Sequence, residues 1–194
     1  RLAESLLPLL SEDREAAVES AKTALGEYAG LYATAWLDGM RTKTGLVSRQ
    51  DDDRSLINDL MEIMNTHQAD FTLTFHYLSG LAIEPADSDR DLQDLFSDPG
   101  AVGEWTQRWR ARLQAEQSDD AGRQASMQAA NPVFIPRNHR IEAVIRAAED
   151  HGDFSVFHEL HTVLQNPYER QPGAAGYMLP PEPDEVVHQT FCGT

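Results

Sequence analysis

Cysteine is almost absent from this chain, since Cys192 is the only one among its 194 residues. A single cysteine excludes an internal disulfide, whereas small secreted domains usually carry several. A reducing cytoplasm is therefore the predicted compartment. Residues 1–10 hold only a short apolar run that Pro8 interrupts, so no signal peptide is expected.

Positive charge is also scarce. Lys22 and Lys43 are the only lysines, and 16 basic residues stand against 32 acidic ones, for a formal net charge of -16. Nucleic-acid binding requires cations that neutralise phosphates, and binding to an anionic membrane surface has the same requirement, so neither partner is expected. The longest weakly polar stretch, residues 71–83, is too short to span a bilayer.

No strand pattern of useful length occurs, while apolar residues recur at steps of three and four, which is typical of helices. A long helix is predicted around the apolar stripe from Val18 to Met40. It is expected to be weakest at Gly26 or Gly30 and to end at Gly45. The prediction is an all-α protein with more than half of its residues in helices.

Seven further helices follow from the same periodicity, with Ser11, Asp70 and Asp153 as predicted N-caps. The stripe of the long helix should pack against the apolar stripes of the next two helices, at residues 56–60 and 75–78. The further helices are predicted over residues 51–64, 70–78, 92–96, 102–113, 120–130, 141–148 and 156–164.

The domain organisation follows from where the helical pattern stops. Residues 1–165 are predicted to form a helical domain, with two packed sub-bundles, 1–83 and 89–165, as one possible division. Residues 166–194 are rich in proline and lack helix signals, so an irregular C-terminal arm is predicted. This arm is expected either to dock in extended form across a partner surface or to be partly mobile.

Three groups of side chains could in principle bind a metal. His158 and His161 lie at i and i+3, and His67 and His76 are nine residues apart, but nothing nearby completes a site, so solvated or structural histidines are predicted. The acidic run 51–53 could bind Mg²⁺, although an acidic first helical turn explains it without a metal. No metal site is predicted.

Two tryptophans spaced by four, Trp105 and Trp109, could form a stacking platform for a ligand base, but core packing on an amphipathic helix is preferred. The sequence contains no glycine-rich phosphate loop, no Lys–Glu pair and no Asp-Phe-Gly type metal motif. No catalytic or cofactor-binding residue is therefore predicted in this chain.

Two segments carry a family resemblance. The first comprises residues 1–10, then 36–41 (Trp-Leu-Asp-Gly-Met-Arg) and 45–46 (Gly-Leu). The second comprises residues 131–139 (Asn-Pro-Val-Phe-Ile-Pro-Arg-Asn-His), 152–154 (Gly-Asp-Phe), 166–168 (Asn-Pro-Tyr) and 191–194 (Phe-Cys-Gly-Thr). In this order and spacing, nearly the whole chain resembles the C-terminal part of the selenoprotein O family.

The resemblance implies a longer enzyme with a kinase-like, pseudokinase-type fold. Such an enzyme transfers AMP from ATP to Ser, Thr or Tyr hydroxyls of proteins, with Mg²⁺ as cofactor. The catalytic and ATP-binding residues of the family lie upstream of the position matched by Arg1, so this chain is expected to be a scaffolding or regulatory part that binds neither ATP nor Mg²⁺ alone. Its implied partners are the kinase-like N-terminal half of the same polypeptide and the protein substrates.

A free-standing helical interaction module without enzymatic activity is the alternative. The apolar first helix, with Leu2, Leu6, Leu7, Leu9 and Leu10, discriminates between the two, because a domain that normally packs on a catalytic half should leave such residues exposed.

The signature residues of the resemblance are predicted to be structural. The Asn-Pro pair should end one helix, and Asn138 should cap the next. The functional alternative is that Arg137 pairs with an acidic group in the kinase-like half. For Cys192 the resemblance implies a reversible regulatory disulfide with a cysteine of that half, and the alternative is an inert tail thiol. The predicted signature set is Asn131, Pro132, Arg137, Asn138, Asn166, Pro167 and Tyr168.

Overall fold

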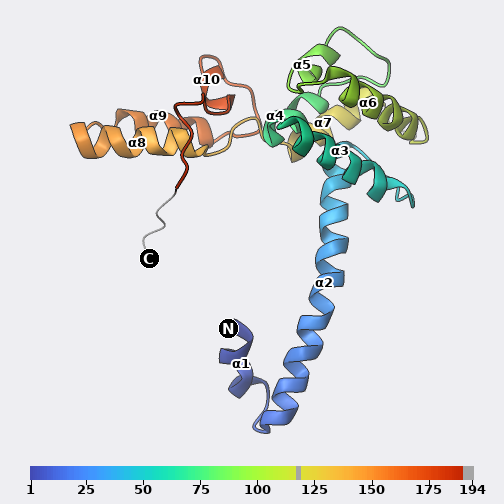
Figure 1. The fold of residues 1–194 in the computed structure, drawn as a ribbon, viewed down its shortest axis with the longest axis vertical. Coiled ribbons are helices and arrows are strands. Elements are labelled where there is room, and N and C mark those ends of the chain that lie inside the picture. The colour runs from blue at the N-terminus through green and yellow to red at the C-terminus, as the bar shows by residue number, and fades with distance from the viewer. Residues whose placement is uncertain (117–118, 190–194) are drawn as a thin grey trace. The chain divides into compact units, whose positions relative to one another are not determined.

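Every regular element in the computed structural model, which describes residues 1–116 and 119–189, is a helix (Figure 1). More than half of the residues are helical, and no strand occurs in the described ranges. The predicted all-α class is thereby confirmed. The chain divides into two compact units, residues 1–40 and 41–194. The limits of the helical domain and of its sub-bundles stay predictions.

The first unit consists of α1 (Leu2–Leu10) and most of α2 (Arg14–Thr44). The carboxylate of Asp13 accepts hydrogen bonds from the backbone N–H groups of Glu15 at 2.8 Å and Ala16 at 3.3 Å. Asp13 therefore caps α2, and the prediction that Ser11 does so is wrong. The helix runs unbroken through Gly26 and Gly30, because an isolated glycine costs a helix only about 1 kcal/mol.

The middle of α2 is not covered within the first unit, since Leu25, Tyr28 and Tyr32 are 61%, 64% and 58% exposed. The packing of this stripe against residues 56–60 and 75–78 stays a prediction. Helical periodicity reports where apolar side chains lie, but not which part of a protein covers them. The predicted exposure of the first helix is confirmed for Leu2, Leu6, Leu9 and Leu10, while Leu7 is half-buried.

The second unit is organised around α6, which carries both tryptophans. Trp105 and Trp109 are fully buried, with ring centroids 6.1 Å apart. Their indole N–H groups donate to the carbonyl oxygens of Leu56 and Thr44, each at 2.8 Å, so they belong to the core and not to a ligand platform. The helices of the bundle are α3 (Asp53–His67), α4 (Phe71–Leu78), α5 (Asp89–Gln93), α6 (Pro99–Gln114) and α7 (Asp120–Ala130).

Three more helices follow the bundle. α8 (Asn138–His151) and α9 (Ser155–Leu164) lie side by side in Figure 1, and the short α10 (Ala175–Met178) lies in the arm. Asp153 accepts a hydrogen bond from Ser155 N at 2.8 Å at the start of α9, as predicted. None of the helices in residues 1–116 and 119–189 combines the length and the apolarity needed to cross a bilayer.

The described part of the C-terminal arm docks on its own chain. Ala174 is buried together with Val133, Phe134 and Val163, and Tyr177 packs against this cluster. The prediction of an arm that is mobile or lies across a partner is therefore wrong for this section. Its proline content excludes long helices, but it does not prevent burial of single apolar side chains.

Gly45 ends α2 as predicted, and a side chain cannot replace its hydrogen there. Its φ is +73°, and a Cβ atom would lie 2.7 Å from Met127 Sδ and 2.9 Å from Arg123 Cγ. Gly45→Ala is expected to lower the free energy of unfolding by about 2 kcal/mol, because both backbone strain and a steric clash arise.

Gly152→Ala is the matched control for this prediction. Gly152 has a φ of +63°, but a Cβ atom added there would meet nothing within 4 Å, so only strain remains and the loss should be about 1 kcal/mol. Urea unfolding of the two variants measures the difference. Equal losses would show that the contact with α7 does not matter.

Candidate functional site

The signature residues come together at one junction between the α3–α7 bundle and the α8–α9 pair. We call this the signature junction and define it by Asn131, Arg137 and Pro167 with their direct partners. The backbone N–H groups of Val133 and Phe134 both donate to the carbonyl oxygen of Pro167, at 2.7 and 3.0 Å. The two signature segments, 131–139 and 166–168, are thereby joined although they are far apart in the sequence.

Asn131 lies at the bundle side of the junction and is almost fully buried. Its side-chain amide donates to the Lys43 carbonyl oxygen and to Ser79 Oγ, both at 2.9 Å, and its oxygen accepts from Lys43 Nζ at 3.1 Å. Lys43 Nζ also donates to the Ala130 carbonyl oxygen at 3.1 Å, and burial lowers the pKa of this lysine. Asn131 thus ties the end of α7 to the ends of α2 and α4.

Arg137 lies at the other side of the junction. Its guanidinium makes two hydrogen bonds to the carboxylate of Asp70, at 2.7 and 2.9 Å. Asp70 also caps α4 by accepting from Leu73 N at 2.8 Å, as predicted. Burial alone would raise the pKa of Asp70, but the hydrogen bonds from Arg137 and from the backbone outweigh burial and lower it. Arg137 therefore has an acidic partner within this chain, which favours the structural interpretation.

The remaining signature residues are peripheral. Asn138 is exposed at the first position of α8 and makes no capping hydrogen bond, so its predicted capping role is wrong: α8 begins one residue too early for it. Tyr168 is 48% exposed. Cys192 lies outside the described residues, and its redox role stays a prediction.

A second buried polar cluster, the Asp53 hub, lies at the start of α3. Asp53 is fully buried, and its two carboxylate oxygens accept from Arg41 Nε at 2.7 Å and Arg112 Nε at 2.8 Å. Arg112 also bonds Glu116 at 2.8 Å. Burial alone would raise the pKa of Asp53, but bonds from the Gln50 N–H and the two arginines outweigh it and lower the pKa. The last residue of the acidic run 51–53 is thus an ion-pair anchor.

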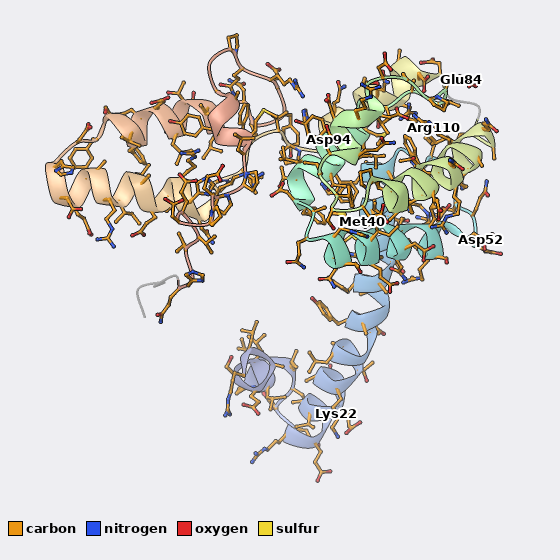
Figure 2. The ribbon with its side chains drawn as sticks, turned by 45° about the horizontal axis from the view of Figure 1, so that its top comes forward. Lys22, Met40, Asp52, Glu84, Asp94 and Arg110 are labelled. Atoms are coloured by element: carbon orange, nitrogen blue, oxygen red, sulfur yellow. The ribbon has the colours of Figure 1, made fainter. Side chains whose placement is uncertain are left out.

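A third ion pair fixes α5. Arg110 of α6, labelled in Figure 2, bonds both carboxylate oxygens of Asp89 at 2.8 Å and also donates to the Ala82 carbonyl oxygen at 3.0 Å. Bidentate arginine–carboxylate pairs of this kind are strong and geometrically specific. The pair holds the loop before α5 against the bundle.

The histidines do not converge. His67 and His76 lie on different helices, because the left-handed residue Gln68 ends α3 between them, and no shared site is formed, as predicted. His76 Nε2 accepts from Arg170 at 3.0 Å, and burial together with the charge of Arg170 lowers its pKa. His158 and His161 are exposed on α9, as predicted. No group of three or more potential metal ligands occurs in residues 1–116 and 119–189.

These arrangements decide what the described residues can do chemically. The carboxylates buried in the two clusters and at α5 are each bonded to arginine, so none is placed to act as a general base. Sequence reasoning missed these pairs, since, apart from Arg112 and Glu116, the partners are 12 to 67 residues apart and no short motif marks them. The clusters fix helices relative to one another, which is a positioning role.

Comparison with known proteins gives consistent matches. Residues 1–165 match the family model described as "Protein adenylyltransferase SelO". The chain is 53% identical over 194 residues to "Protein nucleotidyltransferase YdiU" of Rhodopseudomonas palustris strain BisB18, and 50% and 48% identical to proteins of the same name from Bradyrhizobium diazoefficiens and Rhizobium meliloti. Each match covers 100% of this chain and 39% of the relative. The comparisons do not support the predicted C-terminal placement.

Proposed function

Because the chain belongs to the SelO family of protein adenylyltransferases, we propose that it is a helical, non-catalytic part of an enzyme that transfers AMP from ATP to protein hydroxyl groups. The chain spans 39% of the length of the relatives it matches, so such an enzyme has a larger remainder. We place the catalytic residues, the ATP site and the Mg²⁺ ions in that kinase-like remainder. Its partners are then the remainder and the protein substrates, in the cytoplasm.

The engagement of both lysines supports the non-catalytic role and carries this proposal. A lysine that holds nucleotide phosphates must present a free ammonium group. Lys43 is bound to Ala130 and Asn131, and Lys22, labelled in Figure 2, pairs with Glu19 at 2.8 Å on the surface of α2. The buried arginines are likewise occupied by carboxylates.

The proposal predicts that the isolated chain has no specific affinity for Mg-ATP. Isothermal titration calorimetry should give no saturable heat with the 194-residue chain, whereas the whole enzyme should bind Mg-ATP. The whole enzyme is the positive control in the same buffer. Micromolar binding by the isolated chain would contradict the proposal.

The free-standing helical module is the second candidate. The absence of a nucleotide-binding motif from the sequence is compatible with it. The 39% coverage of the relatives favours a part of a longer enzyme instead. The length of the complete reading frame discriminates between the two, because a frame of about this length would leave only the module.

A further inference from the structure

The middle of α2 is unusual for a helix in contact with water. We call residues 23–37 the apolar segment. Glu27 is its only charged residue, although 25% of the whole chain is charged. Four of its large apolar residues are not buried either, since Leu25, Tyr28, Leu31 and Tyr32 are 58–67% exposed, and only Leu37 at its end is buried. A helix with this composition normally lies inside a protein.

The four exposed side chains lie on one broad face of the helix, within about 120° of one another around its axis. Leu25, Tyr28 and Tyr32 follow one another at steps of three and four, and the two tyrosine rings stack at 6.1 Å. Leu31 is rotated from Tyr32 by about 100° around the helix axis. The apolar surface therefore has the width that normally lies against the rest of a protein.

The apolar segment also has little intrinsic tendency to be helical. Gly26 and Gly30 each cost a helix about 1 kcal/mol relative to alanine, and a Cβ atom added at either residue would meet nothing within 4 Å. In most proteins the stability of such a helix comes from tertiary packing. The segment thus needs packing that the first unit, residues 1–40, does not provide by itself.

We propose that the apolar segment is an interior helix of the whole enzyme, with its exposed apolar face covered by the part of the polypeptide that lies outside this chain. This inference rests on the proposed function, because it requires that longer polypeptide. The relatives supply a remainder of about three fifths of their length, which is large enough to surround a single helical segment of this size.

A second copy of this chain is a poorer occupant. Two chains that each carry a net charge of -16 repel one another. The charge therefore favours the remainder of the same polypeptide.

Amide hydrogen exchange measured by mass spectrometry tests the proposal without a mutation. Peptides from the apolar segment should exchange at least about 100-fold more slowly in the whole enzyme than in the isolated chain. Peptides around Trp105 are the internal reference and should be slow in both, because that residue is buried within the chain itself. Equal exchange of the apolar segment in the two proteins would overturn the proposal.

Two variants of the whole enzyme give a second test. Tyr28→Asp places a charge in the proposed interior and should reduce the protection of the apolar segment at least about 10-fold or prevent soluble expression. Ser20→Asp adds the same charge to an exposed position on the same helix and should change neither. Normal protection in the Tyr28→Asp enzyme would refute interior burial.

Light scattering on the isolated chain separates the remaining occupants. A monomer with fast exchange in the apolar segment is the expected result. If the isolated chain is a dimer and the segment is protected to the same degree as in the whole enzyme, a second copy covers the segment. If the isolated chain is a monomer and the segment is protected, the chain itself covers it. Either result overturns the proposal. These readouts are independent of AMP transfer, so a whole enzyme that lacks that activity but protects the segment would refute only the proposed function.

Discussion

Replacing Asp53 with alanine is expected to lower the free energy of unfolding by about 3–5 kcal/mol, more than any other single substitution proposed for this chain. The carboxylate is fully buried and bonds Arg41 and Arg112 at 2.7 and 2.8 Å. Its removal leaves two guanidinium groups facing one another in a site from which water is excluded. Native domains are stable by about 5–15 kcal/mol, so the variant should be close to unfolding.

Asp59→Ala is the matched control, because Asp59 lies on the same helix and pairs with Arg108 at the surface. Arg108 is about half exposed, so this pair should contribute no more than about 1 kcal/mol. Urea unfolding of both variants gives the comparison. If the two losses are alike, the Asp53 hub does not stabilise the bundle in the way its geometry indicates.

The pH dependence provides an independent check on the Asp53 hub. The folded pKa of Asp53 is lowered, so its ionised form stabilises the fold above the unfolded pKa of about 3.9, and this contribution disappears as the pH falls through the folded value. Asp53→Asn should therefore be destabilised most at neutral pH, and its deficit should shrink below about pH 4. A deficit that stays constant from neutral pH to well below the unfolded pKa would show that charge is not involved.

Most of the helices were predictable because the signals for each helix lie within its own stretch of sequence. Apolar periodicity and the caps at Asp70 and Asp153 marked them within a few residues. The errors were local as well: Asp13 rather than Ser11 caps α2, since both are good capping residues separated by a single position. Periodicity could not show that the middle of α2 is uncovered, because it encodes a face and not a partner.

The polar clusters were much less predictable. The resemblance singled out Asn131 and Arg137, and the structure shows both at the signature junction, but their partners Lys43 and Asp70 could not be read from the sequence. An arginine can pair with any of 32 acidic residues, and only the fold decides which one it reaches. The arginine partners of Asp53 could not be predicted either, because the sequence showed Asp53 only as the last residue of an acidic run at the start of a helix.

The second large loss of stability is expected at the signature junction. Arg137→Met should destabilise the attachment of the α8–α9 pair to the bundle by about 3 kcal/mol, because Asp70 loses both hydrogen bonds from the guanidinium while it stays largely buried. Asp70 remains the cap of α4, so the bundle itself should stay folded. Hydrogen exchange should therefore accelerate in α8 and α9 much more than in α3 and α6.

Arg146→Met is the control, since Arg146 bonds Glu142 on the exposed side of α8 and should have little effect. Adding Asp70→Asn to Arg137→Met then separates charge from packing. The double variant should regain part of the lost stability, because it no longer buries an unpaired carboxylate, although the neutral amide remains able to cap α4. If the two substitutions are simply additive, the ion pair is not what joins the α8–α9 pair to the bundle, and other contacts, such as the hydrogen bond between Arg170 and His76 of α4, must do so.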